Sequence, residues 1–518
     1  MFRALRNILQ LIGIARTLAR HDALFTLDLL GLGPWPQRVA RFALRGPRRS
    51  VRGLRRGQRL VFALQELGPS FIKFGQTWST RADLVGENMA RDLGELRDRL
   101  PPFPTGHARD TVVKELDRPI DELFATFDDH PVAAASIAQV HYAVTVDGDE
   151  VAVKILRPGI EEAFHRDIRL FMWLAEVVER TQPSMRRLKP VAVVANFARI
   201  VDLEMDLRYE AAAASELAEN FDGDATFGVP SVDWQRTSRR VLTLERMIGV
   251  GLSEPGDLTA AGIDRGVVVT NLLQGFLRQV FRDGFFHADL HPGNLFADAD
   301  GNVLAVDFGI MGRLDRQSRL YLSDLLLAFL KRDYWRAAEV HFEAGYVPAD
   351  QSLSAFAQAC RSIGEPILGR PANEISVARL LAQLLQTTET FQMETQPQLL
   401  LLQKTMVVAE GVARSLDADV VVWEIARPVI EEWMRDNLGV AGRVRDGATR
   451  LGGLARRLPD LAEKAESVIS EIADEGFRLH PDTVRALAAA RRGPRRWNGA
   501  IMALAAAIAL AAIAILVG

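Results

Sequence analysis

The sequence predicts an α+β fold in which a small mixed lobe of strands and helices precedes a larger, mostly helical lobe. Strand patterns with hairpin turns are concentrated between about residues 121 and 248. Helical patterns dominate before and after this stretch. Residues 498–518 contain no charged residue, and about 20 helical residues suffice to cross a bilayer. The sequence therefore also predicts a membrane helix at the carboxyl end.

These patterns divide the chain into six segments. The composition, 48% hydrophobic and 25% charged, is typical of a globular protein that can build a large core. The segments are a basic amphipathic membrane-surface segment (1–63), a helical extension (64–120), the small lobe (121–248), the helical lobe (249–436), an amphipathic linker (437–497) and a transmembrane helix (498–518).

The individual elements follow from apolar periodicity and from turn residues. Strands are expected where branched and aromatic residues cluster, and Asp147-Gly148 and Asp300-Gly301 are typical hairpin turns. Helices are expected where apolar residues recur every three or four positions. The expected strands are Leu123–Phe127, Val140–Val146, Val151–Ile155, Val229–Val232 and Val241–Glu245, and the expected helices include Ile160–Thr181, Val191–Asn220 and most of Ser318–Asp436.

Basic residues are concentrated at the amino end, although the net charge of the chain is only −3. Thirteen arginines lie in residues 1–60, opposed by Asp22 and Asp28. Such a segment is attracted to anionic surfaces, and we expect anionic membrane lipid rather than nucleic acid, because aromatic residues for base stacking are sparse among the arginines. The arginines are Arg3, Arg6, Arg16, Arg20, Arg38, Arg41, Arg45, Arg48, Arg49, Arg52, Arg55, Arg56 and Arg59.

Arginines also precede the apolar tail, and Trp497 lies at the expected membrane interface. Basic residues on this side predict a body on the cytoplasmic face of the inner membrane. Cys360 is the sole cysteine, which agrees with a reducing compartment. The alternative is a buried hydrophobic helix, and an alanine-rich tail that inserts could need a partner helix, as in a homo-oligomer. The arginines before the tail are Arg491, Arg492, Arg495 and Arg496.

The strongest chemical signal is the run from His287 to Asn294, followed by Asp307-Phe308-Gly309. Phosphoryl transfer needs a carboxylate beside the attacking oxygen and oxygen ligands for magnesium. We expect Asp289 to act as the base or to orient water. Asn294 and Asp307 would then hold Mg²⁺. A polar turn between helices is the alternative, but spacing, order and hairpin context all favour the catalytic interpretation.

Lys154 ends a Val-Ala-Val-Lys strand, which matches the pattern whose lysine pairs the phosphates of ATP in kinases. A lone strand lysine is more often an exposed edge charge. Its position upstream of the catalytic loop favours the ATP-binding interpretation. The expected partner is a carboxylate on the intervening helix, and Glu204, Asp206 and Glu210 are the candidates, with a solvated acidic face as the alternative.

An alanine-rich stretch stands where a kinase would have its glycine-rich loop. Because a Cβ atom restricts how closely the backbone approaches phosphate, this loop should hold nucleotide differently. Glu245, at the end of an expected strand, completes the candidate nucleotide-binding set. The loop residues in that set are Ala133, Ala134, Ala135, Ser136, Ile137, Ala138, Gln139 and Val140.

Taken in this order, the motifs resemble those of the UbiB family of atypical kinases. Lys73-Phe74-Gly75-Gln76 is also similar to that family's Lys-x-Gly-Gln signature, which ordinary kinases lack. The resemblance covers about Leu64 to Asp436. It implies a bilobal protein-kinase-like fold with an N-terminal helical extension and a C-terminal transmembrane helix.

The resemblance also implies roles for particular residues. Lys73 and Gln76 would lie on an extension over the active site, in contact with Glu204 and Asp206, and Glu210 would pair with Lys154. The protein would bind Mg²⁺ and ATP as an ATPase whose protein-kinase activity is suppressed. Its output would be support of ubiquinone biosynthesis at a membrane, with quinone precursors or quinone-synthesis proteins as partners.

Three other functions remain open at this stage. A small-molecule or lipid phosphotransferase is one, because the catalytic run also resembles that of aminoglycoside- and choline-kinase-like enzymes. A nucleotide-binding scaffold for a quinone-synthesis complex is another, although a scaffold needs no complete metal site. A ring hydroxylase is disfavoured, since no Gly-x-Gly-x-x-Gly follows a strand and two histidines make a poor iron site.

Overall fold

The structure is a computed structural model that describes residues 2–25, 53–79, 86–94, 96, 101–181, 186, 189–368, 387, 390–393 and 396–438. The chain divides into two units, Met1–Arg435 and Asp436–Gly518, and all the site residues discussed below belong to the first. The predicted transmembrane helix 498–518 lies outside the described residues, as does nearly all of the predicted linker 437–497. Among the described helices, none combines the length and the apolar character that a membrane span requires.

The small lobe is built on a five-stranded antiparallel sheet in the order β1-β3-β4-β6, with β2 paired to β3. The predicted hairpin between β3 and β4 is confirmed, and Gly148 in its turn has a φ of +98°, which favours glycine. The strands are β1 (Phe124–Phe127), β2 (Ala133–Ala134), β3 (Ala138–Thr145), β4 (Glu150–Leu156) and β6 (Val241–Glu245).

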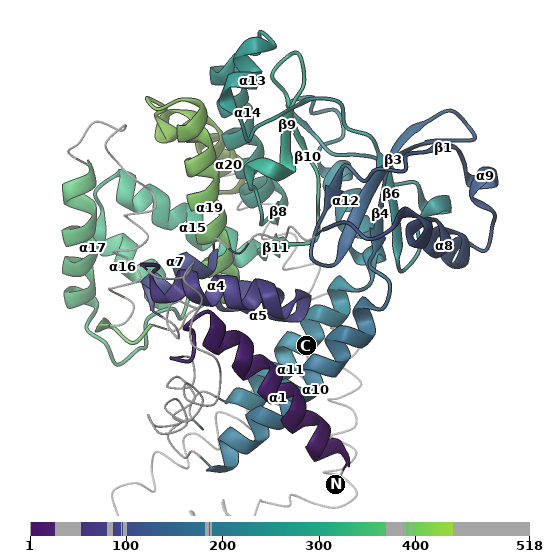
Figure 1. The fold of residues 1–518 in the computed structure, drawn as a ribbon. Coiled ribbons are helices and arrows are strands. Elements are labelled where there is room, and N and C mark those ends of the chain that lie inside the picture. The colour runs from purple at the N-terminus through teal and green to yellow at the C-terminus, as the bar shows by residue number, and fades with distance from the viewer. Residues whose placement is uncertain are drawn as a thin grey trace, which may run out of the picture. The chain divides into compact units, whose positions relative to one another are not determined.

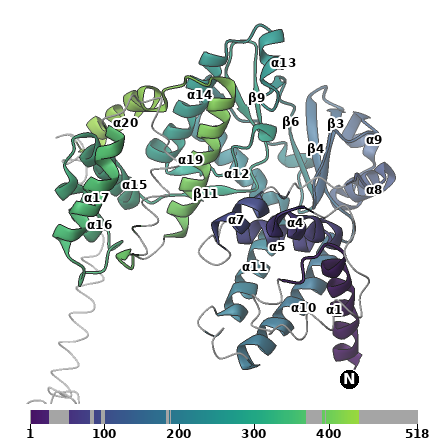
Figure 2. The same cartoon turned by 60° about the vertical axis from the view of Figure 1, so that its left-hand side comes forward.

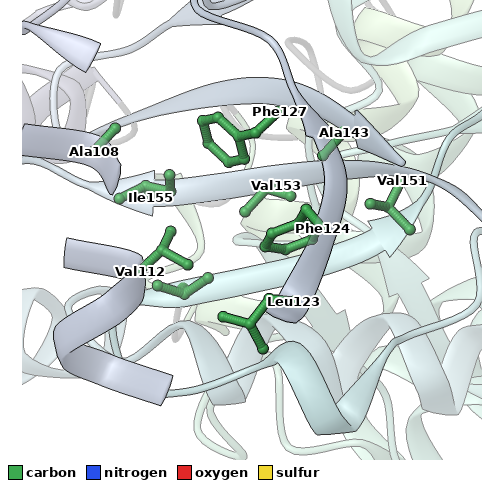
Figure 3. Packing of buried hydrophobic residues seen from close by; sticks show 10 residues of the cluster. Ala108, Val112, Leu123, Phe124, Phe127, Ala143, Val151, Val153 and Ile155 are labelled. Carbon is green, nitrogen blue, oxygen red and sulfur yellow. The ribbon is translucent and has the colours of Figure 1, made fainter. Parts of the chain in front are cut away.

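Alternation along β4 places its apolar and its polar side chains on opposite faces of the sheet. Val151, Val153 and Ile155 are buried in a core with Ala108 and Val112 of helix α8 (Thr105–Leu116) and Leu123 of α9 (Ile120–Leu123), as Figure 3 shows. Lys154 lies between these residues in sequence and therefore projects from the other face. That face is the side on which α12 lies in Figure 1.

The helical region after β4 differs in part from the prediction. Helix α10 (Ile160–Thr181) has the expected bounds, but the expected helix Val191–Asn220 is wrong. Two helices stand there, α11 (Pro190–Glu204) and α12 (Leu207–Asn220). The helix is interrupted because Asp206 leaves the helical conformation. Its side chain caps α12 by accepting from Arg208 N–H.

A second expected element is also wrong. No strand forms at Val229–Val232, where Val232 makes only an isolated bridge to Leu244. The strand that does form lies just before this stretch, at β5 (Phe227–Gly228). It pairs in parallel with β10 (Val303–Ala305) in a sheet of the helical lobe. Pro230 within the expected strand lacks the N–H that a ladder needs, which gives the physical reason.

The helical lobe contains a four-stranded sheet in the order β5-β10-β9-β7 and a two-stranded sheet of β8 and β11. The predicted hairpin at Asp300-Gly301 joins β9 and β10 and is confirmed. The elements are β7 (Val250–Gly251), α13 (Pro255–Ala260), α14 (Arg265–Arg278), η4 (Gln279–Asp283), β8 (Phe285–His287), η5 (Pro292–Asn294), β9 (Leu295–Ala297), β10 (Val303–Ala305), β11 (Met311–Arg313), α15 (Arg316–Leu330), α16 (Tyr334–Glu343), α17 (Leu353–Leu368), α19 (Pro397–Leu416) and α20 (Val422–Leu438).

The extension consists of α1 (Phe2–Arg20), α4 (Arg56–Leu67), α5 (Pro69–Ser79) and α7 (Glu87–Gly94). Figures 1 and 2 both show α4, α5 and α7 lying across one end of the pair α10 and α11. The predicted boundary between residues 63 and 64 falls inside α4, whose buried face continues through both positions. Within α1, Ile14 and Leu18 pack against α4, whereas Leu9 remains 62% exposed.

Candidate active site

Lys154 is the centre of an ion cluster that joins three elements. Its Nζ lies 2.7 Å from Glu210 Oε1 on α12 and 3.2 Å from Asp307 Oδ1 after β10. The lysine side chain is only 15% exposed. Of the three carboxylates left open by the sequence, Glu210 is therefore the partner of Lys154, as the family resemblance implied.

Glu210 and Asp307 differ in their contact with solvent. The Glu210 side chain is 7% exposed, and it also accepts a hydrogen bond from the backbone of Phe308. The Asp307 side chain is 49% exposed. Asp307 has a φ of +63°, a left-handed conformation that costs energy for a residue with a Cβ, and Gly309 N–H donates to its Oδ1 at 3.3 Å. The strained turn thus presents a carboxylate at the surface of the cluster.

The pKa values in the cluster follow from one cation facing two anions. Burial raises the pKa of Glu210 to about 7, because the pull of Lys154 is offset by the nearby Asp307 carboxylate. Burial opposes the charge on Lys154, yet Asp307 and Glu210 together raise its pKa. Burial also acts against Asp307, but Lys154 lowers its pKa to about 2. The half-exposed Asp307 is therefore ionised at neutral pH, whereas Glu210 gains or loses its proton near neutral pH.

The predicted catalytic loop leaves strand β8 at His287 and contains the 3₁₀ turn η5 (Pro292–Asn294). His291 Nδ1 accepts from Gly293 N–H, and Asn294 Nδ2 donates to Asp289 O at 3.1 Å. Asn294 thus closes the loop with its amide nitrogen, which leaves its Oδ1, the atom that could bind a cation, outside that bond. Asp289 is half-buried.

His287 brings the catalytic loop and the Asp307 turn together. Its ring is fully buried and lies edge-on to Phe308, with 5.6 Å between ring centroids. Burial lowers the pKa of His287, although the charges of Asp289 and Asp307 both oppose this. A neutral ring with its proton on Nε2 also fits its contacts, because Nδ1 accepts from Asp289 N–H at 3.1 Å. Asp289 and Asp307 therefore lie near one imidazole.

The alanine-rich stretch forms a tight hairpin at the edge of the small lobe. Ala133 and Ala134 pair with Val140 and Gln139, and Ala135 N–H donates to Ala138 O at 2.8 Å. Ser136 at the turn is fully buried, and its Oγ has no hydrogen-bond partner within the part of the chain that the structure describes.

The side chains of two residues in the predicted nucleotide-binding set make contacts within the protein. Gln139 is 1% exposed, and it accepts from Phe103 N–H while donating to Phe103 O and to His141 Nε2. Glu245 accepts from Ser231 N–H and Oγ–H at 3.2 and 2.9 Å. Alternation along β3 turns Gln139 inward, so its amide braces the hairpin from behind. Any contact of Gln139 with a nucleotide would therefore have to come from its backbone, and the prediction that Gln139 and Glu245 belong to the nucleotide-binding set stays a prediction.

Each residue of the Lys73–Gln76 motif has a packing role in the extension. Lys73 Nζ lies 3.0 Å from Glu204 at the end of α11, as expected. The ring of Phe74 packs against Phe171 and Phe197 on α10 and α11. A Cβ at Gly75 would lie 2.5 Å from Leu96 Cδ1 and 2.6 Å from Leu64 Cδ1, so a larger residue there would require these two leucine side chains to shift.

The remaining expectations for this region are met in part. Gln76 Nε2 approaches Leu96 O at 3.4 Å, which ties α5 to the chain after α7. Asp206 makes no ion pair with the described residues of the extension. Its carboxylate instead binds the Arg208 side chain and backbone, because it serves as the cap of α12. The hydrogen bonds from Arg208 lower the pKa of Asp206.

Sequence reasoning missed two residues that hold the catalytic loop. Gln279 and Thr405 are fully buried, and each makes a hydrogen bond to the backbone of the loop. Neither belongs to a motif. A glutamine and a threonine within helical patterns carry no signal of such a contact.

Comparison with known proteins agrees with the site. The family model for the ABC1 atypical kinase-like domain matches residues 95–341, and that for the UbiB helical domain matches residues 360–421. A probable protein kinase UbiB from Marinobacter nauticus is 41% identical over 458 residues, covering 87% of this chain and 84% of the relative. This chain belongs to the UbiB family. The probable protein kinase UbiB of Pseudomonas fluorescens is 40% identical over 468 residues, with 88% and 87% covered.

Among solved structures, the complex of Rv3197 with erythromycin from Mycobacterium tuberculosis is 26% identical. It covers 71% of this chain and 93% of that chain, with a TM-score of 0.49. The family assignment and the topology described above make this UbiB protein a kinase-like α+β protein. The match to the ABC1 atypical kinase-like domain contains Lys154, Glu210, Asp289 and Asp307. The match to the UbiB helical domain contains helix α19.

Proposed function

We propose that this UbiB protein is an atypical kinase-like ATPase that uses Mg²⁺ and supports ubiquinone biosynthesis at the inner membrane. The observation that carries the proposal is Lys154, held between Glu210 and Asp307 at 2.7 and 3.2 Å. In kinases a strand lysine in such a pair binds the phosphates of ATP. Membership of the UbiB family supports the link to ubiquinone.

The residues present fit a nucleotide and a hard cation. Asp307 offers an ionised, half-exposed carboxylate and Asn294 an amide oxygen, which are the ligand types that Mg²⁺ prefers. Above the pKa of Glu210 the two carboxylates carry one more negative charge than Lys154 neutralises, and a divalent cation would offset this surplus. Mg²⁺ bound there would neutralise charge on the phosphates of ATP during transfer.

The chain's own residues then have separate tasks. Lys154 is oriented by Glu210 so that its ammonium is fixed, and three donors on this group allow further contact with phosphate oxygens. Asp289 accepts the proton of the attacking water or hydroxyl, and Asn294 keeps its loop closed. The alanine-rich hairpin would cover the phosphates, with its backbone fixed by Gln139 from behind.

Attachment to the membrane is a separate part of the proposal. Helix α1 exposes Leu9 and Ile12, at 62% and 39%, on a segment rich in arginine. An apolar stripe next to arginines is typical of helices that lie on anionic lipid. The apolar segment 498–518 supports anchoring by its composition. Isoprenoid quinone precursors or quinone-synthesis proteins are the proposed partners.

The test is ATP hydrolysis by the purified full-length protein in liposomes of anionic lipid, with and without Mg²⁺. Asp307→Asn should lower the Mg²⁺-dependent rate by roughly 100-fold or more, because one preorganised charge is lost at the transferring phosphate. Asp300→Asn, an exposed aspartate in the β9–β10 turn, is the matched control and should keep the rate. Equal rates for wild type and Asp307→Asn would contradict the proposed chemistry.

Cells that carry only Asp307→Asn at normal protein level test the physiological part. A ubiquinone content as low as that of a deletion strain is expected. A wild-type ubiquinone content in these cells would show that the Asp307-dependent chemistry is dispensable. A wild-type content in the deletion strain would exclude a role of this protein in ubiquinone biosynthesis. Transfer of phosphate to a quinone precursor, measured in place of phosphate release, would identify a small-molecule phosphotransferase instead.

A further inference from the structure

The backbone of the catalytic loop is held by side chains that lie outside its motif. His287 N–H donates to Gln279 Oε1 at 2.9 Å, and Ala288 O accepts from Thr405 Oγ1–H at 3.1 Å. These two bonds are made by the two residues that precede Asp289. The carbonyl of Asp289 itself accepts from Asn294 Nδ2–H, within the motif. Ala288 N–H in turn donates to Ile310 O. The backbone that carries Asp289 is therefore fixed at three consecutive residues, 287 to 289.

The Gln279 amide has only one workable orientation. Gln279 is fully buried, and its Nε2 has no hydrogen-bond partner among the described residues. Reversing the amide would point this NH₂ group at His287 N–H, so that two donors would face each other. Gln279 begins the π-helical turn η4 (Gln279–Asp283), which continues α14. Such turns are rare in proteins overall, and those that occur are frequently found at functional sites.

Thr405 reaches the loop from a different part of the chain. It lies on α19, and its fully buried hydroxyl is shared between Ala288 O and Leu401 O one turn earlier on the same helix. Residues 360–421 match the UbiB helical domain, so this contact joins that domain to the catalytic loop. A helix-internal bond alone would satisfy the hydroxyl, and the contact with Ala288 is the additional one.

The last link to the catalytic carboxylate is His287 itself. Its Nδ1 accepts from Asp289 N–H at 3.1 Å, so any shift of His287 moves the backbone of Asp289. A displacement of about 1 Å at a reacting group can cost roughly 100-fold in rate. Residues that never touch the substrate can thereby control the catalytic step.

We propose that Gln279 and Thr405 are positioning residues for Asp289, and that Thr405 couples the UbiB helical domain to the catalytic loop. This inference rests on the proposed ATPase function of the same site. Loss of either contact should free the backbone of residues 287–289 and lower kcat. Binding of Mg-ATP should change less than kcat, because Lys154, Glu210 and Asp307 lie on other elements and only Asn294 among the ATP- and Mg²⁺-binding residues belongs to the loop.

Thr405→Val removes the hydroxyl and keeps the shape of the side chain. Thr111→Val is the matched control, since among the described residues the side chain of buried Thr111 on α8 bonds only to His107 O within its own helix. We expect Thr405→Val to lower kcat for Mg-ATP hydrolysis by roughly 10- to 100-fold. KM should stay within about twofold, and Thr111→Val should keep both values. Gln279→Met should reproduce the Thr405→Val pattern by removing the acceptor for His287 N–H.

A double substitution shows whether Thr405 acts through Asp289. In an Asp289→Asn background, Thr405→Val should cost nothing further, since the group that it positions is already lost. An equal fold-loss in both backgrounds would overturn the proposal. So would an unchanged kcat in Thr405→Val and Gln279→Met, or a loss that appears only in KM.

Hydrogen exchange of the amides in residues 285–290 tests the positioning without relying on turnover. Exchange there should be faster in Thr405→Val and Gln279→Met than in wild type or Thr111→Val. Unchanged exchange would overturn the inference whatever the activity. If wild type had no Mg²⁺-dependent turnover sensitive to Asp307→Asn, the proposed function would fail, while faster exchange in the variants would still support the physical coupling.

Discussion

Glu210→Gln should change how the stability of the protein depends on pH. The substitution keeps an oxygen that can accept from Lys154 Nζ, but it removes the ionisable group. Burial raises the pKa of Glu210 from its usual 4.5 to about 7 in the folded protein. Between these values the folded state binds more protons than the unfolded state, so wild-type stability falls as pH rises through this window. The variant lacks this decline.

The size of the effect follows from the pKa shift. The folded and unfolded values differ by 7 − 4.5 = 2.5 units, and at about 1.4 kcal/mol per unit this corresponds to about 3 kcal/mol. From pH 5 to pH 8, the free energy of unfolding of Glu210→Gln should therefore rise relative to wild type by about 2–3 kcal/mol. The raised pKa of Lys154 affects stability only above its ordinary range near 10.5 and leaves this window untouched.

Urea unfolding followed by tryptophan fluorescence at pH 5 and pH 8, without nucleotide, measures this difference. Glu216→Gln is the control, because it removes a carboxylate from the same helix in an exposed pair with Arg313. A difference between Glu210→Gln and wild type that stays constant over this range would refute the reasoning. It would mean that Glu210 is ionised throughout and that Lys154 compensates its burial fully.

Two further predictions concern packing around the site. Lys73→Met leaves the Glu204 carboxylate, 16% exposed, without its nearby ammonium, and should cost about 2–4 kcal/mol in urea unfolding. Adding Glu204→Gln should recover part of this loss, and a double variant as unstable as the sum of the singles would contradict the pairing. Gly312→Ala would place a Cβ into the ring of Phe286 and should cost at least about 1–3 kcal/mol. An unchanged melting temperature for Gly312→Ala would show that β8 and β11 can separate.

The sequence predicts the elements whose signals are local. The two hairpin turns need a residue with a positive φ, and Gly148 at +98° and Gly301 at +82° provide it. Both hairpins are therefore found where the turn residues predict them. The period of helix α10 is likewise local, and its bounds agree with the structure. The break between α11 and α12 is not visible as a change of period, because apolar residues continue across Met205. It depends on one side-chain bond from Asp206.

The same distinction separates the parts of the site. Lys154, Asp289, Asn294 and Asp307 can be predicted because their chemistry restricts the residue type and the spacing. Lys154 also shows that pattern and structure agree, since the ion pair with Glu210 needs a residue opposite to the buried face of β4. The buried side chain of Gln139 shows the limit. Adjacency to a motif does not determine which face of a strand a side chain occupies.

Gln279 and Thr405 could not be predicted for a deeper reason. Their task is to fix backbone atoms, and a buried hydroxyl or amide in almost any helix could do this once tertiary structure brings it near. Only the fold places Thr405 on Ala288 O, 117 residues apart in sequence. Removing such a side chain leaves a buried carbonyl or N–H unpaired, which is why its loss should be felt at Asp289. The catalytic groups of this UbiB protein can thus be read from its motifs, whereas the precision of their placement depends on residues that no motif contains.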